Sequence, residues 1–247
     1  MNDPLLRPRS AVEIIDTAFS LYRSNFATLA AISLILLGPL QIIGVLVGDP
    51  LGSVISLLSG FLSPIVVGAT VAVVSDAMHG RPISIGSAFG QIAGRWGMLL
   101  TVAIVQGLLT FLGFILLFVP GIIAMCWTFA APMIVVVERT GSVAGAISRS
   151  RQLARGQFWH IFGTLVLSWI IVMVLLFGTA IGIGFLGKLA GLGEHISGFL
   201  GQWVYLLAVP VVGVGSGILY FDLRIRTEAY DIEQLTRSIG DSAATPA

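Results

Sequence analysis

Long apolar runs alternate along this chain with short segments that mix charged and apolar positions. The runs lie at about residues 26–48, 51–77, 96–118, 120–137, 158–186 and 196–221. Because a helix needs about 20 apolar residues to cross a hydrocarbon core of roughly 30 Å, each run predicts one transmembrane helix. The fold class predicted is therefore an all-α integral membrane protein with six transmembrane helices.

The third and fourth spans follow one another without a charged residue between them. Residues 96–137 carry no charge. As a single helix they would be about 63 Å long at about 1.5 Å per residue, roughly twice the membrane core. Proline starts helices well and cannot continue them, so we expect a break and a tight turn at Val119-Pro120-Gly121.

A short amphipathic segment precedes each odd-numbered span, at residues 10–25, 84–95 and 142–156. In the first segment apolar residues recur at helical spacing, at Val12, Ile15, Phe19, Tyr22 and Phe26. This stripe predicts a helix that lies at the cytoplasmic interface or docks on the spans. Ser10 and Glu13 have the spacing of a capping box, which places the start of this helix near Ser10.

The amphipathic segments and spans recur in a threefold pattern. Small or polar residues stand at the same distance before an aromatic residue at the start of the span, in the pairs Ala18/Phe26, Ala88/Trp96 and Ser150/Phe158. Each even span contains a proline, at Pro64, Pro132 and Pro210, where we expect a kink. We predict three helix-pair repeats in one domain, residues 1–236, followed by a disordered cytoplasmic tail, 237–247.

Composition and charge agree with a membrane protein. Of the residues, 56% are hydrophobic and 10% are charged, with a net charge of +1. An ordinary soluble domain carries about 25% charged residues, and a nucleic-acid-binding protein has a basic footprint that this chain lacks.

All the arginines fall before the odd spans or after the last one, whereas Lys188 lies in an opposite loop. The positive-inside rule then places both termini in the cytoplasm, in a bacterial inner membrane. The first apolar run follows a charged helix and is too long for a signal peptide, so no cleavage is expected.

The third amphipathic segment is the most basic and is the candidate contact for anionic lipid or phosphate. Its candidate residues are Arg149, Arg151 and Arg155. Arginine grips phosphate oxygens in a bidentate manner, and each basic residue near an anionic leaflet contributes about 1 kcal/mol. The alternative is that these residues only set the topology. The expected partners are membrane lipids, including anionic ones, with a membrane protein or a second copy of the chain as further options.

A second polar cluster is expected at the cytoplasmic side. Its members are Glu13, Asp16, Arg23, Asp222, Arg224 and Arg226. Asp222/Arg226 and Arg224/Glu228 stand at i,i+4 spacing, which predicts local ion pairs worth a few tenths of a kcal/mol each. A contact between this part of the chain and the first helix is a further hypothesis.

Motifs for catalysis are not found. The chain has no nucleophile elbow, no His-Glu-x-x-His motif and no phosphate-binding loop, so no enzyme, cofactor or metal site is expected. Asp76 and His79 share a helix face and are a weak alternative for metal binding or proton transfer. Gln41 and Gln106 lie within the spans, where interhelical hydrogen bonding is the expected role. Glycine pairs at Gly44/Gly48, Gly178/Gly182 and Gly213/Gly217 permit close packing inside the molecule or between copies.

Several of these residues resemble a known family. The segments that carry the resemblance are Leu6-Arg7-Pro8, residues 13–26, Val119-Pro120-Gly121-Ile122, residues 132–138, residues 149–159 and residues 220–228. They are similar to the membrane domain named after its fusion to glycerophosphoryl diester phosphodiesterases in bacteria. The resemblance implies a polytopic bacterial membrane domain. It includes no phosphodiesterase catalytic domain, so no hydrolase activity is expected from it.

The function expected from these features is non-enzymatic. The protein would organise or present lipids, or anchor a partner, with its basic segments against the cytoplasmic leaflet. A transporter or flippase of lipid-like amphipathic substrates is the alternative, since repeats and broken helices often frame transport sites. An intramembrane hydrolase has the least support.

Overall fold

Helices are the only regular structure among the residues that the computed structural model describes, which are 9–48, 50–189, 191 and 194–243. In chain order they are α1 (Ala11–Ser24), α2 (Phe26–Val47), α3 (Leu51–Met78), α4 (Ile85–Ile92), α5 (Trp96–Leu116), α6 (Phe118–Thr128), α7 (Ala131–Val137), α8 (Val143–Ala154), α9 (Phe158–Leu189) and α10 (Glu194–Ala243). Six stretches are long and apolar enough to cross a membrane, namely Phe26–Val47, Leu51–Met78, Trp96–Leu116, Phe118–Val137, Phe158–Leu189 and Leu200–Glu228. The all-α class and the six membrane-length helices predicted from the sequence are confirmed.

The turn between the third and fourth spans comes earlier than predicted. Leu117 is extended, with φ −168° and ψ 158°, and α6 begins at Phe118. Pro120 therefore lies in the first turn of α6, where its missing N–H costs no hydrogen bond. The two helices approach closely here, because a Cβ on Gly113 would lie 2.8 Å from the Cα of Gly121.

The three predicted kinks differ in the structure. Pro64 lies inside α3 and Pro210 inside α10, and both helices continue through them. Pro132 stands in the first turn of α7, where the fourth span is interrupted between Thr128 and Ala131. Only the proline of the fourth span thus coincides with an end of a helix.

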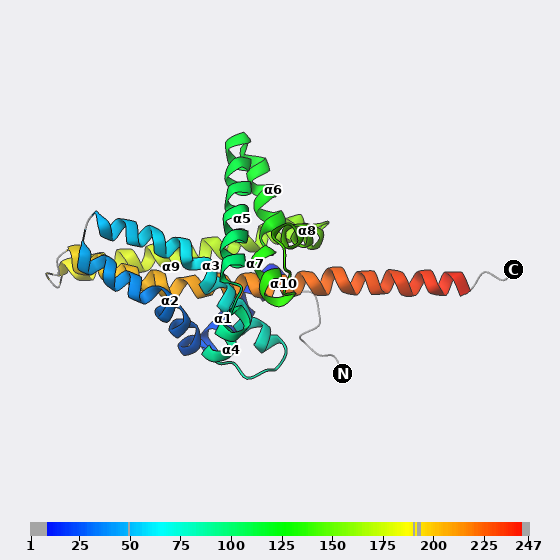
Figure 1. The fold of residues 1–247 in the computed structure, drawn as a ribbon, viewed down its shortest axis with the longest axis horizontal. Coiled ribbons are helices and arrows are strands. Elements are labelled where there is room, and N and C mark those ends of the chain that lie inside the picture. Colours follow the sequence, from blue (N-terminus) through cyan, green and yellow to red (C-terminus); the bar gives the residue numbers. More distant parts are fainter. Residues whose placement is uncertain (1–8, 49, 190, 192–193, 244–247) are drawn as a thin grey trace.

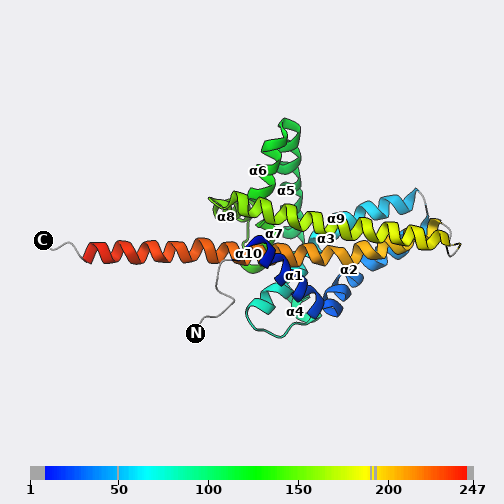
Figure 2. The same cartoon turned by 180° about the vertical axis from the view of Figure 1, so that it is seen from behind.

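The six spans do not all run in one direction. Helices α2, α3, α9 and α10 lie along the long axis of the molecule, whereas α5 and α6 form a hairpin that stands away from them (Figures 1 and 2). We call these the four-helix bundle and the α5–α6 hairpin. Helix α7 returns from the base of the hairpin and packs on α3. The third and fourth spans therefore lie side by side in the hairpin. In the bundle α10, which contains the last span, packs against α3 and α9.

The interior lies where α3, α7 and α10 meet. Side chains of α7 from Ala131 to Val136 are all buried, as is most of α3 from Ile65 to Asp76. By contrast, only 11% of the residues in an apolar 18-residue stretch of α5, and likewise of α9, are buried, against 56% in the corresponding stretch of α3. Helices α5 and α9 thus present apolar side chains outward, as expected of surfaces in contact with lipid.

Glycines allow α10 to lie close against α3. A Cβ on Gly213 would lie 2.8 Å from the Cβ of Thr70, and one on Gly217 would lie 3.2 Å from Val74. The pair Gly213/Gly217 therefore serves packing inside the molecule. Around a Cβ built on Gly178 no atom of the described chain lies within 4 Å, so that glycine is open.

Helix α1 packs through a different face from the predicted stripe. Its buried residues are Ile14 and Ala18, whereas Val12 and Phe19 are 65% and 60% exposed. The stripe prediction is wrong as a docking face, because Ile14 and Ala18, which lie between the stripe residues along the chain, are the side chains that α1 buries against the neighbouring helices α9 and α10. The predicted capping box of Ser10 and Glu13 is present.

Helix α10 extends beyond the bundle. Its backbone is helical through Ala243. Residues 237–243, which the sequence predicts to belong to a disordered tail, continue this helix, and residues 244–247 lie outside the described part of the chain.

The contact between α10 and α3 leads to a test with a single methyl group. We expect Gly213→Ala to lower the stability by about 1–3 kcal/mol, because the new methyl group forces α10 away from Thr70. Gly178→Ala adds the same group in open space and should leave stability unchanged or raise it by up to about 1 kcal/mol through helix propensity. Thermal unfolding of both variants in one detergent measures the difference, and equal stabilities would contradict this packing.

Candidate functional site

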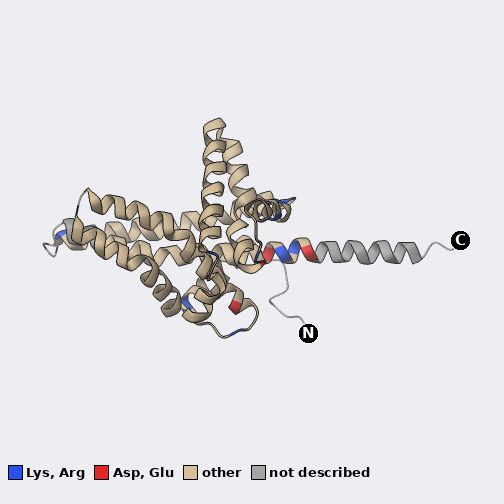
Figure 3. Cartoon of the chain, in the orientation of Figure 1, with Lys and Arg blue, Asp and Glu red and all other residues tan. Residues whose placement is uncertain are grey.

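Charged side chains gather at one end of the bundle, on or beside α1, α4, α7, α8 and the adjoining part of α10 (Figure 3). The α5–α6 hairpin carries no charge along its length, and Lys188 lies in the last turn of α9, at the far end of the bundle. We refer to this charged region as the polar end. It contains three buried or half-buried acids, Asp76, Asp222 and Glu138, and each stands at the end of an even span or close to it.

Asp222 of α10 holds the start of α1. This side chain is fully buried. Its Oδ1 accepts a hydrogen bond of 2.6 Å from the backbone N–H of Arg9, and its Oδ2 accepts one of 2.6 Å from the Arg226 guanidinium. Arg226 also donates to the backbone carbonyl of Arg9. Nε2 of His160, in the first turn of α9, lies 2.9 Å from the same carboxylate. One carboxylate thus joins α1, α9 and α10.

Tyr22 makes a second connection between α1 and α10. Its hydroxyl donates to the backbone carbonyl of Leu207 over 2.8 Å. Burial raises the pKa of the Tyr22 phenol above its ordinary value. The phenol therefore stays a neutral donor at physiological pH, and it fixes the far end of α1.

Asp76 in the last turn of α3 holds α4. Its Oδ2 accepts hydrogen bonds from Ser87, at 2.6 Å, and from Gln91, at 2.9 Å. Its Oδ1 forms an ion pair of 2.9 Å with Arg81. Nδ1 of His79 lies 2.7 Å from the backbone carbonyl of Ser75. Asp76 and His79, the weak alternative for metal binding or proton transfer, are thus each engaged in structural contacts. Among the described residues no group of three metal-ligating side chains occurs.

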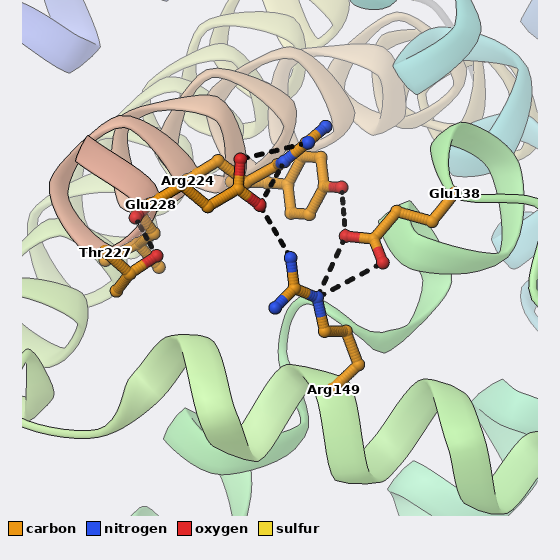
Figure 4. Close-up of polar contacts among 7 residues, drawn as sticks. Glu138, Arg149, Arg224, Thr227 and Glu228 are labelled. Atoms are coloured by element: carbon orange, nitrogen blue, oxygen red, sulfur yellow. Dashed lines mark hydrogen bonds and ion pairs between the residues drawn. The ribbon is translucent and has the colours of Figure 1, made fainter. Parts of the chain in front are cut away.

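Glu138, the residue after α7, holds α8 (Figure 4). Nε of Arg149 lies 3.2 Å from Glu138 Oε2, and the other end of this guanidinium donates to Glu228 over 2.6 Å. The buried hydroxyl of Tyr220 donates to Glu138 over 2.9 Å. Arg224 forms a bidentate pair with Glu228. Arg149 therefore bridges two acids and links α7, α8 and α10.

The three acids share one arrangement. Asp76 binds α4, Glu138 binds α8, and Asp222 binds the backbone just before α1. Each short helix is thus fixed by the acid of the span that precedes it, and α1 by the acid of the last span, which closes the series onto the beginning of the chain.

The three predicted lipid-contact arginines have different surroundings. Arg149 is held by Glu138 and Glu228, so it is not free to bind phosphate. Arg151 is exposed, with its Cζ 4.4 Å from the centre of the Trp127 ring. Arg155 is exposed where α8 ends. Arg149 thus differs from Arg151 and Arg155 in the predicted contact, because Glu138 and Glu228 occupy its guanidinium.

The predicted polar cluster separates into two parts. The i,i+4 pairs Asp222/Arg226 and Arg224/Glu228 both form. Glu13 accepts from the backbone N–H of Ser10 within the capping box, while Asp16 and Arg23 are exposed on the outer side of α1. The contact between α10 and the first helix exists, and its polar part is formed by the backbone of Arg9 with Asp222 and by the Tyr22 hydroxyl with the carbonyl of Leu207.

Within the spans Gln41 forms the expected interhelical hydrogen bonds. It donates to Ser59 of α3 over 2.9 Å and accepts from Gln202 of α10. Gln106 of α5 is half-buried and makes no hydrogen bond to any described residue. At the interruption between α6 and α7, buried Ser150 of α8 accepts from the N–H of Ala130 and donates to the carbonyl of Trp127. These backbone groups would otherwise be left unpaired.

Two open spaces flank α5. The first, about 370 Å³, lies between α3 and α5 and is lined by Gly60, Phe61, Pro64, Leu100, Ala103, Ile104, Gly107, Leu108 and Phe111. We call it the α3–α5 groove. The second, about 540 Å³, lies between α5 and α8 and is lined by Val105, Val143, Ala144, Ile147, Ser148 and Arg151. We call it the α5–α8 pocket. The groove is wholly apolar, whereas the pocket combines an apolar wall with one guanidinium and one hydroxyl.

Sequence reasoning missed several residues of the polar end. Four of them are Arg9, Glu138, His160 and Tyr220. Glu138 had a usable signal, since it follows the fourth span as Asp76 and Asp222 follow the second and the sixth. For the other three the partner lies between 62 and 213 residues away along the chain. No local pattern points to such pairs.

Comparison of the chain with protein-family models, with curated proteins and with solved structures finds no match.

The role of Asp222 leads to a prediction about α1. We expect Asp222→Asn to lower the stability by about 3–5 kcal/mol, because it leaves Arg226 without its buried partner. It should also free the start of α1, which hydrogen exchange of the amides in α1 detects as faster exchange. Asp16→Asn removes an exposed charge from α1 itself and serves as the control. Unchanged exchange in Asp222→Asn would contradict the proposed attachment.

Proposed function

We propose that this protein is a non-enzymatic multi-pass membrane protein that organises lipid, and that an acyl chain occupies the α3–α5 groove. The observation that carries the proposal is the departure of the α5–α6 hairpin from the bundle, which leaves this groove open. Its lining contains no charged or hydrogen-bonding side chain. Such a wall suits an acyl chain rather than a polar solute.

The composition of the hairpin supports lipid on all its sides. No residue from 96 to 137 is charged, and Leu108, Phe111 and Leu112 are among its many exposed apolar residues. A helix that is apolar all round belongs in hydrocarbon or in a protein core, whereas an interfacial helix needs a polar face. This composition supports lipid in the space between the hairpin and the bundle.

The groove is long enough for part of an acyl chain. Its lining on α5 extends from Leu100 to Phe111. At about 1.5 Å per residue this distance is about 17 Å.

The orientation that we propose places the polar end in the cytoplasm of a bacterial inner membrane. All the described arginines lie toward that end, and the positive-inside rule supports this choice. The arrangement of α1, α4 and α8 at this end also supports three helix-pair repeats with interfacial helices. At matched positions Ala18, Ala88 and Ser150 are all buried, and Gly94 and Gly156 both have φ +73° two residues before a span begins.

Movement of lipid between the leaflets is a second candidate function. It is favoured by Pro64, which lies in the wall of the groove, since a proline in a membrane helix permits local adjustment of the backbone. The assay uses proteoliposomes that contain a fluorescent lipid. It measures how fast the lipid that a quencher can reach disappears from the outer leaflet. Empty liposomes are the control.

Filling the groove tests the leading proposal. Gly107 lines it, and a Cβ built on Gly107 meets no atom of the described chain within 4 Å. We expect Gly107→Phe to fold normally and to retain fewer phosphatidylcholine molecules after delipidation, as measured by native mass spectrometry. Gly178→Phe places the same ring on open α9 and should retain lipid like the unaltered protein. Equal retention in both variants would reject the groove as a lipid site, while a co-purifying protein in place of lipid would favour a membrane anchor.

A further inference from the structure

We infer that the α5–α8 pocket is a binding site for one anionic phospholipid, with the phosphate at Arg151 and an acyl chain along Val105 and Ile147. This inference deepens the proposed lipid function, but it concerns a different site from the α3–α5 groove. It names both the ligand class and the residue that selects it.

Arg151 differs from the other arginines of the polar end that have acidic partners. Arg81, Arg149, Arg224 and Arg226 each pair with a carboxylate. Among the described residues no carboxylate pairs with Arg151. Its exposed guanidinium therefore keeps its full hydrogen-bonding capacity for an incoming anion.

Trp127 fixes the position of this guanidinium. The Arg151 Cζ lies 4.4 Å from the centre of the indole ring, within the range of a cation–π contact. The contact orders the side chain before a ligand arrives, and the edge of the guanidinium remains open for bidentate contact with phosphate. Trp127 itself is 37% exposed, as is typical of tryptophan at the level of lipid headgroups.

The wall of the pocket supplies the apolar half of the site. Val105 comes from α5, and Val143, Ala144 and Ile147 come from one side of α8. Ser148 adds a hydroxyl beside the guanidinium. A volume of about 540 Å³ is within the range of pockets that hold small ligands. A cation and a hydroxyl at one edge of an apolar wall match a phosphate attached to an acyl chain.

The surrounding charge favours an anionic lipid over a zwitterionic one. Arg139 is also exposed, just after the end of α7, and the two acids of this region are already held by Arg149 and Arg224. The outward-facing charge next to the pocket is therefore positive.

The test uses the full chain in nanodiscs of phosphatidylcholine with a small share of phosphatidylglycerol of the same acyl chains. Native mass spectrometry measures the enrichment of bound phosphatidylglycerol. We expect enrichment by the unaltered protein and about fivefold weaker enrichment by Arg151→Gln, the factor expected from one basic residue facing an anionic lipid. Arg151→Lys keeps the charge but not the bidentate geometry and should fall between the two.

Arg155→Gln is the matched control, because it removes an equal charge from the same helix outside the pocket lining. It should retain the enrichment. If Arg155→Gln and Arg151→Gln lose enrichment equally, the effect is general surface charge and the inference is overturned. It is also overturned if Arg151→Gln behaves like the unaltered protein.

A second pair of variants tests the apolar wall without changing charge. Ala144→Trp should fill the pocket and reduce the enrichment, whereas Gln152→Trp adds the same ring at an exposed position of α8 outside the lining. Soluble glycerol phosphate, which has no acyl chain, should not compete with the lipid. Effective competition by glycerol phosphate would point to a phosphate site that does not use the wall.

These outcomes separate the inference from the proposed function. Gly107→Phe changes retention of phosphatidylcholine in the groove, and Arg151→Gln changes the preference for phosphatidylglycerol in the pocket. If Arg151→Gln lowers the preference but Gly107→Phe leaves retention unchanged, the pocket is supported and the groove is rejected; the opposite pair of results supports the groove and rejects the pocket.

Discussion

The buried carboxylate of Asp222 is the interaction on which the polar end depends. A charge without solvent is costly unless it is paired and hydrogen-bonded. Here the backbone N–H of Arg9, the guanidinium of Arg226 and the imidazole of His160 surround it. Because these groups come from the start of α1, from α10 and from α9, one desolvated charge determines where the first helix meets the last two.

Asp76 and Glu138 solve the same problem for α4 and α8. Short helices are marginal alone and need tertiary contacts to remain in place. Each acid supplies such a contact at the point where a span leaves the apolar interior, because burying polar groups costs less free energy there. Lipid-facing parts of the molecule then need no polar contacts of their own, which agrees with the uncharged α5–α6 hairpin and the exposed apolar side of α9.

The hairpin connects the fold with the proposed function. Helices α3, α7, α8 and α9 tie it to the remainder of the molecule. Away from the base it diverges, so one side of α5 borders the α3–α5 groove and another borders the α5–α8 pocket. Arg149 holds α8 in place through Glu138 and Glu228, and Arg151 of the same helix stays exposed, where we propose that it selects a lipid headgroup.

The sequence by itself determined the features that depend on neighbouring residues. The six membrane-length helices follow from apolar length, the ion pairs of α10 from i,i+4 spacing, and the capping box of α1 from Ser10 and Glu13. Only the tertiary structure decided which residues meet across the chain. Arg9 and Asp222 are 213 positions apart, and Arg149 and Arg151 look alike in sequence yet face opposite surroundings. The direction of the hairpin also depends on packing at its base, because a uniformly apolar helix carries no pattern that marks its inner face.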